Sequence, residues 1–375
     1  MLYCLPTGFI TLFMLSYGVS ASSIGIITAI SSILAAVGQL AVGNIVDSCR
    51  KISWKTLLLI ICAIQALILL TLLFSNSNKL ISTALFPGFM VLMYLQMPLV
   101  NASIFYYTSR GLSLDFGSAR GTGSLTYAFI SFVCGQLVAF TGEIAIIYLS
   151  ILTLLGLTLV TAFMPTIKDE PDQKTEKTQK QPAKRKVGII SFVRKYPKFT
   201  LVLVGSIFLM SFHNITHTYM IQMIENIGGN SASMGTAFSI EAISELPIMF
   251  GFYKLIQKIP INKLMIIAGI AFVFKSLAYL CAVNVLTLYI AQVLQMLSYA
   301  IFASASVYFA NEKMEEEDKV TGQSYMTATM SIGAVIGNFV GGLVLDAFGI
   351  RALLVICVMI TIIGASVTFV GARNN

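Results

Sequence analysis

Long apolar segments dominate this chain and set the first limit on its fold. Of its 375 residues, 57% are hydrophobic and 11% are charged, whereas a soluble globular domain carries about 25% charged residues. A helix needs roughly 20 mostly apolar residues to cross a bilayer, and segments of that length recur along the whole chain. The apolar runs are too long and too little alternating for barrel strands, so the sequence predicts an all-α integral membrane protein.

A polar, basic segment divides the apolar chain. Residues 166–198 hold ten Lys or Arg residues together with Pro171 and Pro182, a composition typical of a flexible linker. We therefore predict an N-terminal helical bundle in residues 1–165, a linker over 166–198 and a C-terminal bundle of six helices in 199–375. The expected membrane spans are residues 2–17, 23–46, 54–75, 80–106, 121–141, 144–165, 199–222, 231–256, 263–284, 286–310, 321–346 and 350–371.

The first expected span is short for a membrane helix. It contains Pro6 and Gly8 and lacks the basic segment that opens a signal peptide. An even number of spans places both chain ends on one side of the membrane. Because this first apolar run is shorter than a full membrane span, we expect the first helix to be truncated at its N-terminus, with Met1 inside it. The first bundle then has about five and a half spans.

The positive charges indicate the orientation in the membrane. The formal net charge is +8, and every Lys and Arg except Lys79, Lys275 and Arg351 falls on or near the side of residues 166–198. Lys and Arg accumulate in cytoplasmic loops, so we predict a multi-pass cell-membrane protein whose central loop and C-terminus are cytoplasmic. The basic excess thus reflects contact with a lipid bilayer, and no nucleic-acid binding is predicted.

Ionisable side chains within the spans are the first functional candidates, because a charge in the bilayer costs at least about 2.5 kcal/mol. Glu241 and Glu245 are four residues apart and share one helix face, where like charges repel. Lys275 in the next span is the expected cationic partner. The functional interpretation is a protonatable carboxylate or substrate anchor, with Glu245 favoured because Pro247 follows it. The alternative is an ion pair that only orients helices.

His213 and His217 are the two histidines of the chain and are also four residues apart. Histidine titrates near neutral pH, which suits contact with a proton or a substrate, and a hydrogen-bonded structural pair is the alternative. No metal site is predicted, because Asn214 stands where a zinc motif has Glu and the sequence shows no third ligand. No cofactor is predicted either.

Arg120 lies in a segment with three glycines, residues 117–123. Small residues allow a helix or a ligand to approach the backbone, and the guanidinium offers five donors in a fixed fork that suits hydroxyls, a carboxylate or a phosphate. A snorkelling anchor at the membrane surface is the alternative. The uncharged Asn101 and Gln295 also lie within spans, where helix–helix hydrogen bonds explain most polar residues.

Four motifs occur in an order that resembles a known superfamily. Residues 43–51, with Gly43 and Asp47 before Arg50 and Lys51, resemble its loop between spans two and three. Residues 116–123 resemble a span-five segment whose arginine binds sugar. Residues 244–247 (Ser-Glu-Leu-Pro) resemble a Glu-x-Pro of span eight, and residues 322–323 and 341–346 resemble the two ends of span eleven. The chain thus resembles the major facilitator superfamily, particularly the lactose-permease-like and phenylpropionate-permease-like proton symporters.

The departures from this pattern limit what the resemblance implies. Arg50 replaces the second glycine of the loop motif, and Asn101 stands near a sugar-binding glutamate of span four. Gln295 replaces the span-ten histidine central to proton coupling, and Lys275 replaces a span-nine arginine. Lactose specificity is therefore not expected, and proton coupling would have to use the two glutamates or the histidines.

The resemblance implies two six-helix bundles of the major facilitator fold and a secondary transporter that works by alternating access. We expect a monomer, and no enzyme is predicted, because the sequence contains no His-Glu-x-x-His, Gly-x-Ser-x-Gly or metal-cluster motif. We predict proton-coupled uptake of a small polar organic solute such as a sugar, nucleoside or aromatic acid. A drug or metabolite exporter of the same fold and a non-transporting membrane sensor are the alternatives. The candidate substrate-binding residues are Arg120, Asn101, Lys275, Gln295 and His217, the proton-coupling residues are Glu245, Glu241 and His213, and the conformational loop motif is Gly43, Asp47, Arg50 and Lys51.

Overall fold

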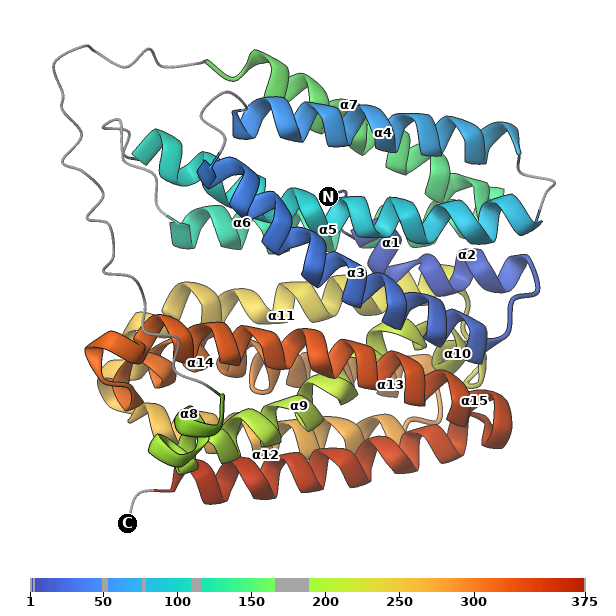
Figure 1. Ribbon diagram of the computed structural model, residues 1–375. Helices are drawn as coiled ribbons and strands as arrows, with labels where there is room; N and C mark the ends of the chain where they lie inside the picture. Colours follow the sequence, from blue (N-terminus) through green and yellow to red (C-terminus); the bar gives the residue numbers. More distant parts are fainter. Residues whose placement is uncertain are drawn as a thin grey trace, which may run out of the picture.

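The computed structural model describes residue 2 and residues 4–48, 53–75, 79–108, 116–165 and 189–373, which form helices and no strand. The all-α prediction is confirmed for these residues (Figure 1). In chain order the helices are α1 (Cys4–Gly8), α2 (Ile10–Ser16), α3 (Ala21–Ser48), α4 (Trp54–Phe74), α5 (Lys79–Thr108), α6 (Phe116–Thr141), α7 (Ile144–Phe163), α8 (Ile189–Lys195), α9 (Pro197–Thr218), α10 (Met220–Glu225), α11 (Ser231–Lys258), α12 (Ile261–Leu280), α13 (Val285–Val293), α14 (Tyr299–Lys313) and α15 (Lys319–Ala372), with 3₁₀ turns η1 (Leu294–Met296) and η2 (Glu316–Asp318).

Nine of the described helical segments are long and apolar enough to cross a membrane. The last of them, Glu316–Ala372, includes α15, which runs through two of the expected spans. Within α15 the backbone leaves the helix at Gly349, whose φ of 77° is open to glycine and strained for other residues. This glycine lets the chain reverse between the expected spans 321–346 and 350–371.

Three expected spans are broken and not continuous. The first consists of α1 and α2, separated by Phe9 with φ −112° and ψ 3°. The seventh is interrupted at Tyr219, whose hydroxyl donates to the carbonyl of Asn338 at 2.6 Å. The tenth contains the turn η1, so α13 and α14 are separate helices. The hydropathy of the sequence does not reveal these breaks.

The helices before and after the central segment form two groups. In Figure 1 the helices from residues 4–163 lie in the upper part of the molecule and those from residues 189–372 in the lower part. The groups meet through α3 with α15 and through α6 with α11. Gly135 of α6 and Gly235 of α11 face each other, and an added Cβ on Gly135 would lie 2.7 Å from the Cα of Gly235. Glycine at both positions therefore permits this close crossing.

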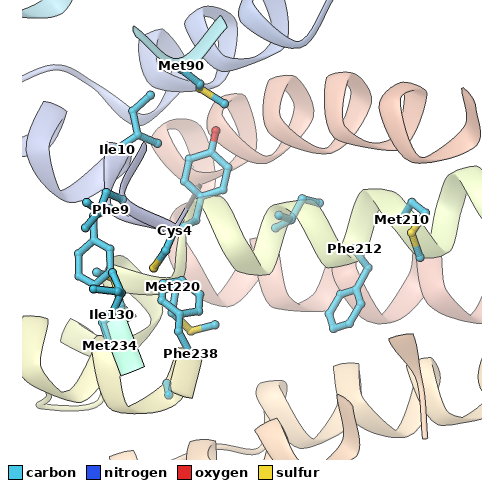
Figure 2. Close-up of a cluster of buried hydrophobic side chains, with 14 of the residues drawn as sticks. Cys4, Phe9, Ile10, Met90, Ile130, Met210, Phe212, Met220, Met234 and Phe238 are labelled. Carbon is cyan, nitrogen blue, oxygen red and sulfur yellow. The ribbon is translucent and has the colours of Figure 1, made fainter. Parts of the chain in front are cut away.

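Buried apolar side chains fill the space where α1 and α2 meet the second group. In Figure 2, Cys4 and Phe9 lie toward Met234 and Phe238 of α11, whereas Ile10 lies toward Met90. The rings of Phe9 and Phe238 lie 6.2 Å apart in an edge-on arrangement, a favourable geometry for an aromatic pair. The short first helices are therefore part of the contact between the two groups.

Polar contacts close the interface at the end of the molecule away from α8 (Figure 1). The carboxylate of Asp346 on α15 accepts hydrogen bonds from the backbone N–H groups of Ala21 at 3.1 Å and Ser22 at 2.7 Å. These N–H groups open α3, and a carboxylate is stabilised at a helix N-terminus. The hydroxyl of Ser239 on α11 also donates to the carbonyl of Ala128 on α6 at 2.6 Å.

Candidate functional site

A cavity of about 410 Å³ lies between the two groups of helices. Residues from both groups line it, so its shape depends on how the groups sit together. Its volume falls within the usual range for small-molecule sites, about 300–1,000 Å³. The lining residues are Thr7, Ile10, Thr28, Met90, Tyr94, Met97, Gly123, Ser124 and Tyr127 from the first group and His213, Asn214, His217, Thr218, Glu241, Ala242, Glu245, Met249, Tyr299 and Asn338 from the second.

A continuous chain of polar contacts runs along one wall of this cavity. Nε2 of His217 lies 3.2 Å from Oε2 of Glu241, and Oε1 of Glu241 lies 3.1 Å from Nζ of Lys275. Lys275 donates to Oε1 of Gln295 at 2.5 Å, and Nε2 of Gln295 donates to Oε1 of Glu245 at 2.9 Å. We call these five residues the polar chain.

The local helix geometry explains how the polar chain is assembled. Glu241 and Glu245 are one turn apart on α11, and Glu241 contacts Lys275, which is fully buried on α12. Gln295 lies in the 3₁₀ turn η1 between α13 and α14. Its amide inserts between the lysine and the second glutamate. Glu241 thus has a direct cationic partner, whereas Glu245 reaches Lys275 only through a neutral amide.

Aromatic rings hold the two histidines in place. The His213 ring stacks on Tyr299 with centroids 4.3 Å apart and planes at 12°, and the His217 ring stacks on Phe238 at 4.9 Å and 23°. Nδ1 of His213 is buried and has no hydrogen-bond partner among the described residues. This nitrogen is therefore an unsatisfied polar atom in a residue that lines the cavity.

The structure supplies a third possible metal ligand that the sequence analysis did not find. One ligand atom each from His213, His217 and Glu241 can be chosen so that all lie within 4.8 Å of one another. Glu241 is therefore a candidate third ligand that the sequence alone does not place beside the two histidines. The ammonium group of Lys275, 3.1 Å from Glu241, opposes a dication at this position, because like charges repel strongly where water is excluded.

The predicted site residues differ in whether they line the cavity. His213, His217, Glu241 and Glu245 line the cavity. Lys275 and Gln295 are 0% and 1% exposed and do not line the cavity. In this structure neither side chain can contact a substrate in the cavity directly. Their contacts to the glutamates make them part of the wall's support.

Asn101 does not reach the cavity; it is an exposed residue of α5. Arg120 belongs to α6, but its side chain lies outside the described part of the structure. Gly43 and Asp47 belong to α3, and the side chain of Asp47 likewise lies outside the described part. Arg50 and Lys51 fall outside the described residues altogether.

The sequence analysis did not identify several small polar residues that line the cavity. Thr28 and Ser124 face the cavity from the first group of helices, and Thr218 and Asn338 from the second. The hydroxyl of Thr218 donates to Oδ1 of Asn338 at 2.7 Å. Small hydroxyl residues are common in packed membrane helices, so the sequence carries no signal that separates these residues from ordinary packing.

Two groups of membrane helices that enclose a buried, charged cavity define the architecture of the major facilitator transporters. The chain matches the model of the MFS_1 like family over residues 4–356. It therefore belongs to that family, as its motifs led us to expect.

Comparison with individual proteins agrees with this family. The chain is 25% identical to the maltose permease of Geobacillus stearothermophilus over 178 residues, which are 47% of this chain and 45% of that protein. The match thus spans less than half the length of this curated relative.

Solved structures of low sequence identity show the same fold. The nucleoside transporter NupG superimposes with a TM-score of 0.78 at 17% identity, over 99% of this chain and 95% of that one. A bacterial homologue of the human lysosomal transporter Spinster, in an inward-facing and unoccupied conformation, gives a TM-score of 0.68 at 14% identity over 99% and 95%. The predicted major facilitator fold is confirmed.

Proposed function

We propose that this protein is a monomeric secondary transporter that takes up a small, polar, uncharged solute together with protons. The observation that carries the proposal is the polar chain along the wall of a cavity lined by both groups of helices. A cavity shared between two bundles can be exposed alternately to either side of the membrane when the bundles rock.

The cavity wall favours an uncharged solute with hydroxyl groups. Its described ionisable residues other than tyrosines are two glutamates and two histidines, which repel an anion when the glutamates are charged. Tyrosine, threonine, serine and asparagine side chains supply further hydrogen-bonding groups. The maltose permease and the nucleoside transporter among the similar proteins make a sugar or a nucleoside the preferred substrate class, ahead of an aromatic acid.

Glu245 is the residue that we assign to proton coupling. It is 9% exposed and lines the cavity, and its hydrogen bond comes from the neutral amide of Gln295. A buried carboxylate without a direct cation is costly in its charged form. Glu241 differs, because Lys275 and His217 lie within 3.2 Å of its oxygens. Protonation of Glu245 therefore offers a switch beside the substrate.

We also propose that this conformation faces the cytoplasm. The contacts of Asp346 with the start of α3 close the end away from α8, and the positive-inside rule places residues 166–198 in the cytoplasm. Opening toward the outside would require these contacts to break.

Transport assays in liposomes test the proposal. Sugars, nucleosides and aromatic acids are first screened for a rise in melting temperature of the purified protein, since a bound ligand stabilises the folded state. The ligand found is then assayed twice, by exchange across the membrane and by accumulation driven by a pH gradient. Glu245→Gln is compared with Glu225→Gln, which changes an exposed glutamate of α10.

We expect Glu245→Gln to keep exchange and to lose at least about tenfold in proton-driven accumulation, while Glu225→Gln behaves as the unmodified protein. Accumulation that survives Glu245→Gln with its pH dependence intact contradicts the coupling assignment. Binding without exchange in the unmodified protein contradicts transport itself and favours a sensor.

A further inference from the structure

A second cavity lies at the end of the molecule where α8 and α9 meet the end of α15, apart from the central cavity. Its volume is about 610 Å³. Residues at the start of α9 and at the end of α15 line this cavity, together with residues of α12 and α14. In Figure 1, α8, the start of α9 and the end of α15 lie at the same end of the molecule.

Four basic side chains line this second cavity, which we call the basic cavity. Lys195, Lys198, Lys313 and Arg373 all line it, and no described carboxylate does. The ammonium group of Lys195 donates hydrogen bonds to Asp318 at 2.8 Å and to Glu315 at 2.7 Å, and neither carboxylate lines the cavity. These two hydrogen bonds raise the pKa of Lys195, and the bond to Asp318 contributes most. Lys195 therefore stays charged at neutral pH.

The other cations add to this charge. Lys313 pairs with Glu312 at 3.0 Å, a residue that does not line the cavity. Arg373 is exposed and forms no salt bridge with a described residue. Glu312, Glu315 and Asp318 thus offset part of the charge of the lysines, while the described lining itself holds basic side chains and no carboxylate.

The start of α9 adds a second, independent feature that favours an anion. Its N-cap, Tyr196, makes no side-chain capping hydrogen bond, and the first-turn residues Lys198 and Phe199 line the cavity. Pro197 at the first position of α9 has no N–H, and the N–H of Thr200 bonds to the carbonyl of Tyr196 at 2.9 Å. The helix end therefore offers at most the N–H groups of its second and third positions, which carry partial positive charge. Phosphate groups bind readily at such helix ends.

Apolar surface next to the cations points to a lipid as the source of the phosphate. Phe199 and Phe309 are buried and stack in the cavity wall with centroids 5.8 Å apart. On the adjoining α8, Ile190 is 73% and Val193 is 41% exposed, beside the basic end of the helix. Exposed apolar side chains next to lysines are typical of segments that lie at the membrane surface.

We propose that this basic cavity binds the phosphate-bearing headgroup of an anionic phospholipid from the adjacent leaflet. Basic pockets between membrane helices are known to hold such headgroups. The phosphate would lie among Lys198, Lys313, Arg373 and the start of α9, and the acyl chains would extend along the exposed apolar side chains of α8. This site is independent of the proposed transport function.

Lipid titrations of the full-length protein in detergent test the proposal, with melting temperature and native mass spectrometry as readouts. The lipids are phosphatidylglycerol and uncharged phosphatidylcholine, and sn-glycerol 3-phosphate represents a soluble phosphate. The cavity variant is Lys198→Gln/Lys313→Gln/Arg373→Gln. The matched control, Lys254→Gln/Lys258→Gln/Lys263→Gln, removes three exposed lysines that do not line the cavity.

We expect phosphatidylglycerol to raise the melting temperature saturably in the unmodified protein and the control. The cavity variant should need at least about tenfold more lipid, because it lacks three of the four basic side chains that line the cavity. Equal titrations of the two triple variants, or equal stabilisation by phosphatidylcholine, would overturn the proposal. A full response to glycerol 3-phosphate at the same concentrations would refute the lipid as the source. If the triple variant fails to fold, Arg373→Gln alone should retain fewer bound lipids in the mass spectrum than Lys263→Gln.

Discussion

Replacing Lys275 by methionine tests the electrostatics of the polar chain most directly. The side chains of Lys275 and Glu241 are 1% and 4% exposed, and their charged atoms lie 3.1 Å apart. Methionine keeps the unbranched shape of lysine and removes its charge. The substitution leaves Glu241 buried beside His217 alone, and Gln295 loses the donor to its side-chain oxygen.

The expected effect is large because solvent screens this pair very little. Removing one partner of a buried ion pair costs about 3–5 kcal/mol, whereas replacing both partners by neutral groups is often close to neutral. We therefore expect Lys275→Met to destabilise the protein by about 3 kcal/mol or more. Glu241→Gln/Lys275→Met should regain most of that loss, which makes the two substitutions strongly non-additive.

The measurement is a double-mutant cycle of unfolding in detergent micelles, followed by loss of helical circular dichroism. Lys263→Met is the matched control, because Lys263 is an exposed residue of the same helix, α12, and should change stability by less than about 0.5 kcal/mol. If Lys275→Met is no more harmful than Lys263→Met, or if the double variant is no more stable than Lys275→Met, the buried ion pair does not stabilise the fold and the reasoning fails.

Three further predictions concern the helix contacts and the region of α8. Asp346→Asn should weaken the contact with the start of α3 by about 1–3 kcal/mol and speed amide hydrogen exchange there, while exchange in α12 stays unchanged. Gly135→Ala should lower the melting temperature or separate α6 from α11, because its methyl group would meet the facing backbone. Gly156→Ala, with no atom within 4 Å of its added Cβ, should be neutral or slightly stabilising. Lys195→Met should lower the melting temperature by a constant amount from about pH 6 to 9. Hydrogen bonding to Asp318 raises the pKa of Lys195, so its contribution is present at lower pH and is lost only as pH rises through that raised pKa.

The helices and part of the site could be predicted from the sequence because both produce recognisable local patterns of residues. Span lengths follow from apolar run length, and the four-residue spacing placed Glu241 and Glu245 on one face of α11. Lys275 was the natural partner because few charges lie within the spans, and the structure contains its contact with Glu241. The order of motifs gave the superfamily, which the family match confirms.

The rest of the site depends on contacts between distant segments. Gln295 meets Lys275 and Glu245 because the chain forms a 3₁₀ turn at Leu294–Met296, and no local motif marks that turn. Asn101 was a candidate through its sequence position, yet it is exposed on α5 and does not line the cavity. Rotation of a helix about its own axis decides which polar residues face inward, and packing sets that rotation.

The charge balance of the polar chain explains how a proton could control movement of the two groups of helices. With neutral imidazoles, the ammonium of Lys275 offsets one of the two carboxylates, Glu241 and Glu245, and one negative charge remains at the cavity wall. An unbalanced buried charge is costly, and here it lies on Glu245, the carboxylate that is 9% exposed and lines the cavity. One proton removes this imbalance without breaking the Glu241–Lys275 pair. A neutral solute leaves the balance unchanged, so its movement alone cannot replace the proton. Under the proposed proton coupling, one proton per solute is the simplest stoichiometry that restores the charge balance at the cavity wall.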